Sequence, residues 1–244
     1  MTRLAAVACE VFRRELTAAA EKSRSAVETH WLPQGLHDTP DELRRRLRET
    51  LSEIERADAQ APPGERLDAV VLCYGLCGGL AGVRAGRLPL VLPRTDDCIG
   101  ILLGSQRRYL DYFHSRDGIY WYTPGWLDFA KTPSRAWYDA KLREYAERYG
   151  PDNAAWLLEQ ENAWISAYGA CVYIDPPACP SPAHARRARE AAGEYGWRFE
   201  AVPGGAGLLD ALLAGEWDET RFFLCPPGKA VAPSWREDIF KAEA

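Results

Sequence analysis

The chain has 244 residues, which is enough for one large domain or for two lobes that share a core. Its apolar fraction of 47% and charged fraction of 27% are typical of a soluble globular protein, and no apolar stretch is long enough to span a membrane. The net charge of -5 and the lack of a basic run argue against a nucleic-acid-binding protein.

The N-terminal residues lack the features of a secretory signal. Met1-Thr2-Arg3 leads into a short apolar run that ends before Glu10, whereas a signal peptide has a longer apolar segment and a small-residue cleavage site. We therefore expect a cytoplasmic protein. In that compartment the seven cysteines are expected to be reduced, catalytic or metal-bound rather than joined in disulfides.

The first half of the chain alternates between strand and helix patterns. Strands are expected at 4–8, 26–31, 68–74, 88–92 and 118–122, and helices at 10–22, 38–58 and 97–115. The second helix has the clearest start, with Asp38 or Thr39 as its cap and Pro40 in its first turn.

The second half begins with a segment of different character. Residues 132–167 have a helical pattern rich in aromatic and charged residues; strands are then expected at 170–174, 197–201 and 221–224, and helices at 183–195 and 204–214. This alternation predicts an α/β fold with a Rossmann-like, mostly parallel sheet and crossover helices. We expect a single domain over 1–244, with possible lobes at 1–125 and 168–244 and a helical insertion at 132–167.

Three cysteines follow three of the apolar runs. Cys9 closes the first run, Cys77 lies in the glycine turn after the third, and Cys98 follows the fourth. Ligands bind outside the carboxyl ends of parallel strands, so the three thiols are expected to converge in one crevice. Three cysteine ligands with an open fourth position suit a zinc ion, which we favour, and a [4Fe-4S] cluster is the alternative.

Other cysteines and glycines near this crevice have several interpretations. Cys73 is expected in the core, and Cys225 is a reserve ligand. Gly75, Gly78 and Gly79 would let backbone N–H groups approach a cofactor. In the alternative interpretation, the cysteines are small buried hydrophobic residues.

Four further residues are candidates for catalysis or substrate binding. His37 could act as an acid–base group or a fourth ligand, or could be a solvated loop residue. Arg94 could hold a substrate carboxylate, while Asp96 and Asp97 after it could cap a helix.

Tyr122 and Trp126 could bind a quaternary ammonium group by cation–π attraction, or could belong to a core aromatic layer. The turns after the first five strands are expected to meet at one sheet edge. That arrangement would bring His37, Cys77, Arg94 and Trp126 into one pocket suited to a small molecule such as a betaine.

The motifs around these residues resemble the domain-of-unknown-function family 1638. They are Ala8-Cys9-Glu10-Val11, Leu32-Pro33-Gln34-Gly35-Leu36-His37-Asp38, Tyr74-Gly75-Leu76-Cys77-Gly78, Pro93-Arg94-Thr95-Asp96-Asp97-Cys98 and Tyr122-Thr123-Pro124-Gly125-Trp126. Members resemble accessory proteins found beside corrinoid-dependent methyltransferases. The family usually has histidine where this chain has Asp96. The strand-end cysteines also resemble, in layout, those of 2-hydroxyacyl-CoA dehydratase subunits.

Two functions are compatible with these observations. The first is a metal-binding enzyme, with zinc or an iron–sulfur cluster, that acts on a small molecule in one-carbon or methylamine metabolism as a methyltransferase or lyase. The second is a non-catalytic accessory or sensor protein of a corrinoid methyltransferase system. The resemblance implies a corrinoid protein or a methyltransferase as partner, and neither nucleic acid nor membrane is expected as one.

Overall fold

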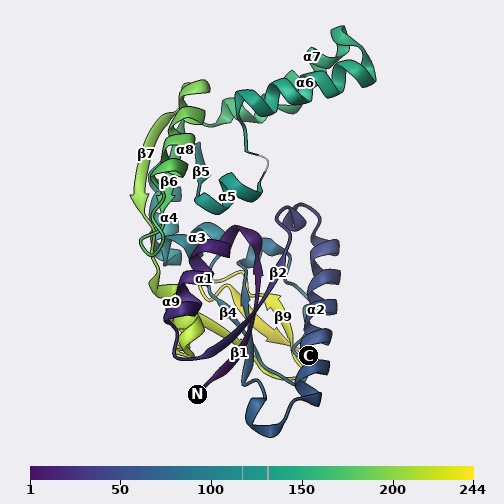
Figure 1. The fold of residues 1–244 in the computed structure, drawn as a ribbon, viewed down its shortest axis with the longest axis vertical. Coiled ribbons are helices and arrows are strands. Elements are labelled where there is room, and N and C mark those ends of the chain that lie inside the picture. Colours follow the sequence, from purple (N-terminus) through teal and green to yellow (C-terminus); the bar gives the residue numbers. More distant parts are fainter. Residues whose placement is uncertain (117, 131) are drawn as a thin grey trace. The chain divides into compact units, whose positions relative to one another are not determined.

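The computed structural model describes residues 1–116, 118–130 and 132–244, which form two compact units (Figure 1). Unit 1 contains residues 1–110, 176–179 and 204–244, and unit 2 contains residues 111–175 and 180–203. The helical insertion expected at 132–167 lies wholly in unit 2. The structure groups the remaining residues differently from the expected lobes, because each unit has a sheet of its own.

Unit 1 is built around a five-stranded sheet with the order β2-β1-β3-β4-β8. Its first four strands pair in parallel, and β8 is antiparallel to β4. The strands are β1 (Arg3–Cys9), β2 (Ala26–Leu32), β3 (Ala69–Cys73), β4 (Leu90–Pro93) and β8 (Phe222–Cys225). The predicted α/β class with a mostly parallel sheet is confirmed.

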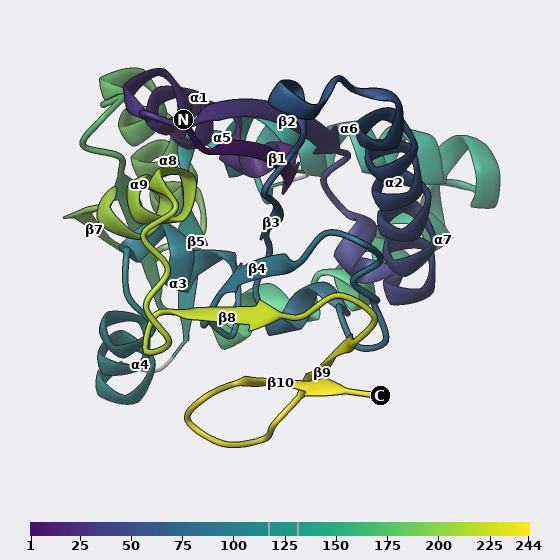
Figure 2. The ribbon, with the colours of Figure 1, turned by 90° about the horizontal axis from the view of Figure 1, so that it is seen from below.

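Helices cover both faces of this sheet (Figure 2). On one side lies α2 (Pro40–Gln60), whose buried residues Leu43, Leu47 and Leu51 recur every four positions. On the other side α1 (Arg13–Lys22), preceded by the 3-10 turn η1 (Glu10–Phe12), packs against α9 (Gly207–Ala214). Because both faces are covered, β3 is buried along its whole length.

The helix expected at 97–115 is interrupted. The structure has α3 (Cys98–Leu103) and α4 (Gln106–Ser115), separated at Gly104, whose φ is 78°. A Cβ atom at Gly104 would lie 2.8 Å from the Cα atom of Gly205. The break thus allows two backbones to approach closely, which a helical pattern in the sequence does not reveal.

Unit 2 has a three-stranded parallel sheet with the order β5-β6-β7. Its strands are β5 (Ile119–Tyr122), β6 (Ala170–Asp175) and β7 (Arg198–Pro203). Helix α8 (Pro182–Glu194) packs on β6 and β7, and α6 (Arg135–Tyr149) pairs with α7 (Pro151–Glu161). The shorter helical elements are α5 (Pro124–Phe129) and η5 (Ala163–Ala167).

Two expectations about strands need correction. The fifth strand, β5, lies in the second sheet, so the first five strands do not share one edge. The pattern analysis also missed a C-terminal hairpin of β9 (Ala230–Pro233) and β10 (Phe240–Glu243), which are too short to show a clear alternation. Short strands of this kind are defined by their partners more than by their own sequence.

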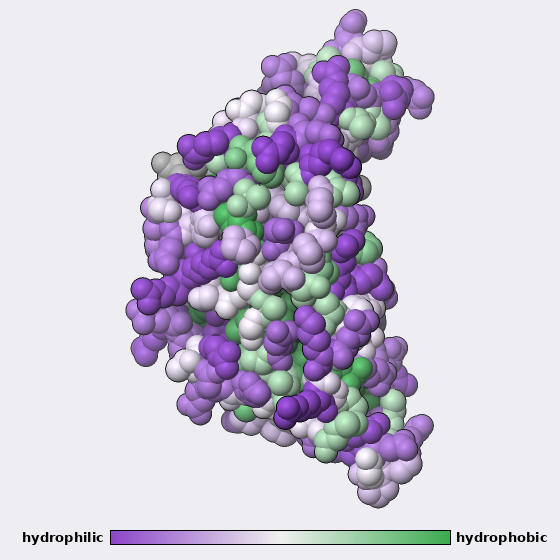
Figure 3. Space-filling view, turned by 60° about the vertical axis from the view of Figure 1, so that its left-hand side comes forward, coloured by the Kyte–Doolittle hydropathy of each residue, from purple (hydrophilic) through white to green (hydrophobic). Residues whose placement is uncertain are grey.

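The surface and the helix lengths agree with the composition. On the face shown in Figure 3, hydrophilic residues predominate and hydrophobic ones form small separate patches. In the part of the chain that the structure describes, no helix is both long enough and apolar enough to cross a bilayer.

Candidate functional site

The candidate site lies at the carboxyl ends of β1, β3 and β4, which are neighbouring parallel strands. Cys9 is the last residue of β1. Cys77 lies in η4 (Leu76–Gly78), directly after β3, and Cys98 is the first residue of α3, after β4. The topology therefore brings the three cysteine-bearing segments to one edge of the sheet.

The Cys9 thiol is held near the start of η1. Burial raises the pKa of this thiol to about 11, although the backbone N–H groups of Val11 and Glu10 donate hydrogen bonds to the sulfur and lower it. Cys9 is therefore a protonated thiol at neutral pH.

The Cys77 loop is fastened to the loop after β4 by backbone hydrogen bonds. Leu76 N–H donates to the carbonyl oxygen of Thr95 at 3.0 Å, and Cys77 N–H donates to that of Asp96 at 2.7 Å. In return, the N–H of Cys98 donates to the Cys77 sulfur. Part of the Cys77 side chain reaches solvent, but surrounding protein and the Asp97 carboxylate raise the pKa of the thiol to about 12.

Glycine is required at two points of this loop by close packing. A Cβ atom on Gly75 would lie 2.5 Å from the Asp97 Cα atom. Gly79 has a φ of 68°, and its carbonyl accepts a 3.2 Å hydrogen bond from Arg44 of α2. Gly78 ends η4. The fold itself therefore explains why positions 75 and 79 are glycine. A cofactor-binding role for Gly75, Gly78 and Gly79 stays a prediction.

The two acidic residues before Cys98 organise the start of α3. The Asp97 carboxylate accepts hydrogen bonds from the N–H groups of Ile99 and Gly100, so the capping interpretation is confirmed for Asp97. Burial raises the pKa of Asp97, while those hydrogen bonds and one from the Tyr109 hydroxyl lower it. Asp96 accepts a 2.5 Å hydrogen bond from the Gln106 side chain.

Tyr74 is a residue of this site that pattern analysis missed. It follows β3 directly, its side chain is 7% exposed, and its hydroxyl has no hydrogen-bond partner among the described residues. Burial, together with the nearby Cys9, Cys73 and Glu10, raises its pKa well above the usual value. The sequence signal that could have identified Tyr74 as a site residue is its position between the end of a strand and the Cys77 turn.

His37 follows β2 and Arg94 follows β4, which flank β1 and β3 in the sheet. His37 lies in η2 (Leu36–Asp38), which packs against η4, and its Nε2 atom is 3.3 Å from an Asp38 carboxylate oxygen. The Arg94 guanidinium donates to four backbone carbonyls and lies over the Phe223 ring. The four acceptors are the carbonyls of Glu219, Phe222, Asp238 and Phe240. Arg94 thus ties the C-terminal segment to the sheet, and the structure gives its guanidinium a role other than holding a carboxylate.

Cys225 lies at the other end of the sheet. It pairs with Leu90, the first residue of β4, because β8 is antiparallel to β4. The amino end of β4 is remote from the edge that carries Cys98, so Cys225 is excluded as a reserve ligand. Cys73 is fully buried in β3, which confirms its expected place in the core.

The two aromatic substrate candidates belong to unit 2. Tyr122 is 0% exposed and donates a 3.0 Å hydrogen bond to the carbonyl of Pro133, so it is a core residue with no surface available to a substrate. Trp126 lies in the first turn of α5, where its N–H bonds to the Thr123 hydroxyl. Cys9, Cys77 and Cys98 lie in unit 1, and the substrate role of Trp126 stays a prediction.

Unit 2 also contains a serine–histidine–aspartate chain that pattern analysis did not single out. The Ser181 hydroxyl lies 2.5 Å from Nδ1 of His184, and Nε2 of His184 lies 2.8 Å from an Asp128 carboxylate oxygen. Ser181 and His184 are both buried. The imidazole therefore links the start of α8 to α5.

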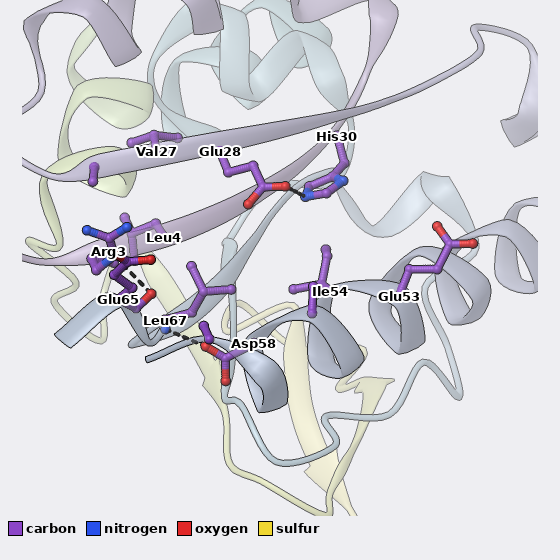
Figure 4. Close-up of a pocket in the computed structure, with 13 residues that line it drawn as sticks. Arg3, Leu4, Val27, Glu28, His30, Glu53, Ile54, Asp58, Glu65 and Leu67 are labelled. Atoms are coloured by element: carbon purple, nitrogen blue, oxygen red, sulfur yellow. Dashed lines mark hydrogen bonds and ion pairs between the residues drawn. The ribbon is translucent and has the colours of Figure 1, made fainter. Parts of the chain in front are cut away.

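A pocket of about 490 Å³ lies between β2 and the second half of α2 (Figure 4). Glu28 and His30 extend into it from β2, with 3.1 Å between the carboxylate and Nε2, and Glu53 and Asp58 line it from α2. Because it reaches the amino ends of β1 and β2, at Leu4 and Ala26, it is separate from the cysteine edge.

Across the described residues, no group of three or more His, Cys, Asp or Glu side chains is already arranged to hold a metal ion. The backbone brings the three cysteines to one edge, but a shared metal would require their side chains to turn. Metal binding at this edge therefore depends on a change in the cysteine side-chain conformations.

The comparisons with known proteins identify a protein family. Residues 31–213 match a family described as "Protein of unknown function (DUF1638)". No curated protein and no solved structure matches the chain.

Proposed function

Since the chain belongs to the DUF1638 family, whose description names no activity, we propose a function from its own residues: Cys9, Cys77 and Cys98 bind a metal centre at which a small molecule reacts. One observation carries this proposal: Cys9, Cys77 and Cys98 lie at the carboxyl ends of three adjacent parallel strands.

The chemistry of the site suits a cation. Burial is the main cause of the raised pKa of the Cys77 thiol, and the carboxylates of Asp97 and Asp96 raise it further, so negative charge also opposes deprotonation there. A bound metal ion would replace the thiol protons and neutralise that charge. To bind one metal ion together, the three cysteine side chains would have to rotate about χ1.

Zinc is our first choice, with three thiolates and one open position, and a [4Fe-4S] cluster with one open iron is the alternative. When bound, zinc would act as a Lewis acid that activates a thiol or a water molecule. The chain would contribute a fixed loop geometry through Asp97, and we propose His37, on η2 beside η4, as an acid–base group.

We propose the substrate class from the family resemblance. A methylated amine or betaine would make the protein a cytoplasmic methyltransferase or lyase of one-carbon metabolism, working with a corrinoid protein. A closed, unreactive four-ligand site would instead favour an accessory or sensor role in the same system.

Elemental analysis and an anaerobic absorption spectrum of the purified protein test the metal. We expect one zinc per chain, or a brown protein with iron and sulfide. The matched variants are Cys77→Ser and Cys73→Ser: the first should lose the metal, while the second should retain it and lose about 1–3 kcal/mol of stability, because a buried hydroxyl replaces a core thiol. Equal metal content in both variants, or no metal in the wild type, would contradict the proposal.

A further inference from the structure

The Tyr74 hydroxyl is a buried polar group at the cysteine edge that lacks a partner within the described ranges. Leaving a buried hydroxyl unpaired costs stability, and phenylalanine would fill the same space without that cost. An unpaired group of this kind in a native protein calls for an explanation, such as a bound ligand or water.

The strand register places Tyr74 beside Cys9. β1 and β3 pair in parallel as far as Ala8 and Cys73, and Cys9 and Tyr74 are the residues that follow this last pair. Side chains of paired residues in parallel strands point to the same face, and neighbouring strands are about 4.8 Å apart. Both residues belong to, or pack against, the core cluster on the α2 side of the sheet.

Several other polar groups near Tyr74 have hydrogen-bond partners. The N–H groups of Leu76 and Cys77 bond to backbone carbonyls, and the Asp97 carboxylate caps α3. The Thr95 hydroxyl also lacks a partner in the described part of the chain, but its side chain packs against Gly100 of α3. Tyr74 is thus the unpaired donor on the side of the sheet that carries Cys9.

We propose that the Tyr74 hydroxyl donates a hydrogen bond to an oxygen atom of the small molecule bound at the cysteine site. This inference rests on the proposed metal-binding function. It defines the substrate class: the molecule carries an acceptor oxygen, as in a carboxylate, carbonyl or hydroxyl group.

The first arm of the test measures metal-free protein. Tyr74→Phe should leave the melting temperature unchanged or raise it, because it removes a hydroxyl without a partner. The matched control is Tyr122→Phe, which removes a buried hydroxyl that bonds to the Pro133 carbonyl. The control should melt about 2–4 °C lower, as expected for one lost hydrogen bond in a chain of this size.

The second arm uses protein loaded with Co²⁺ in place of zinc, whose visible bands report the fourth ligand; if the native centre is an iron–sulfur cluster, its own absorption is followed. The probes are 2-mercaptoethanol and ethanethiol, which differ by one hydroxyl group. The wild type should bind 2-mercaptoethanol about fivefold more tightly, and Tyr74→Phe should remove that preference while retaining full metal content.

Each outcome separates this inference from the proposed function. A Tyr74→Phe variant that melts as low as Tyr122→Phe, or that keeps the wild-type preference between the thiols, would overturn the role of Tyr74 and leave the metal site standing. Failure of the wild type to bind any metal would overturn the site itself.

Discussion

Replacing Gly75 by alanine should destabilise unit 1 through one steric clash. Gly75 has φ and ψ of -90° and -177°, which alanine adopts without strain. The added methyl group would lie 2.5 Å from Cα, 2.6 Å from N and 2.8 Å from C of Asp97. All three contacts are with backbone, so no side chain can turn aside to relieve them.

The size of the effect follows from how firmly that backbone is held. Asp97 lies between Asp96, whose carbonyl accepts from Cys77 N–H, and the first turn of α3. Overpacking against a fixed backbone costs about 3 kcal/mol, the upper end of the usual range. The lower entropy of an unfolded chain with alanine offsets about 0.4–1 kcal/mol of that cost. The net loss of about 2 kcal/mol corresponds to a melting temperature about 4–8 °C lower.

Urea unfolding followed by circular dichroism measures this loss. Gly64→Ala is the control in the same unit, because a Cβ atom there meets nothing within 4 Å. It should be neutral or slightly stabilising, since only the entropy of the unfolded chain changes. If the two variants have equal stability, the close approach between Gly75 and Asp97 is not a constraint on the fold, and the reasoning fails.

Two further predictions concern charged groups of unit 1. Burial opposes ionisation of Asp58, but hydrogen bonds from Leu67 N–H at 2.6 Å and Arg87 at 2.5 Å lower its pKa. Asp58→Asn should therefore lower the free energy of unfolding by about 1–3 kcal/mol at pH 7. The difference in stability from wild type should shrink as the pH falls below about 4 and through the lowered pKa of Asp58. A constant difference from pH 7 to pH 2 would contradict this. Arg94→Lys should leave the metal content unchanged but speed amide hydrogen exchange in β9 and β10, because a lysine cannot bond to four separated carbonyls. Unchanged exchange would show that Arg94 does not hold the hairpin of β9 and β10 in place.

Much of unit 1 could be predicted from its sequence, because its signals are local. The apolar runs of β1 and β3 are bounded by polar turns, and Pro40 with its neighbouring acids marks the start of α2. Each of these elements buries residues at the spacing that its pattern implies. The convergence of Cys9, Cys77 and Cys98 at one edge then follows from parallel pairing alone.

What could not be predicted depends on contacts between distant segments. The assignment of β5 to a second sheet is decided by its pairing with β6, and the break at Gly104 by the approach of Gly205. Likewise, the Arg94 side chain meets carbonyls 125 to 146 residues further along the chain. A single sequence shows which residue types are present, but not which distant backbone each one meets.

The position of β8 has a consequence for the order in which the protein folds during synthesis. The strands that carry the cysteine site, β1, β3 and β4, all lie in the first hundred residues, whereas β8 pairs with β4 from the far end of the chain. Phe222, to which Arg94 bonds, follows it by 128 residues. Until those residues leave the ribosome, β4 is an open edge able to pair with the wrong strand. Under the proposed function, a metal ion bound by the three thiols at this stage would hold β1, β3 and β4 in register while the rest of the chain is made.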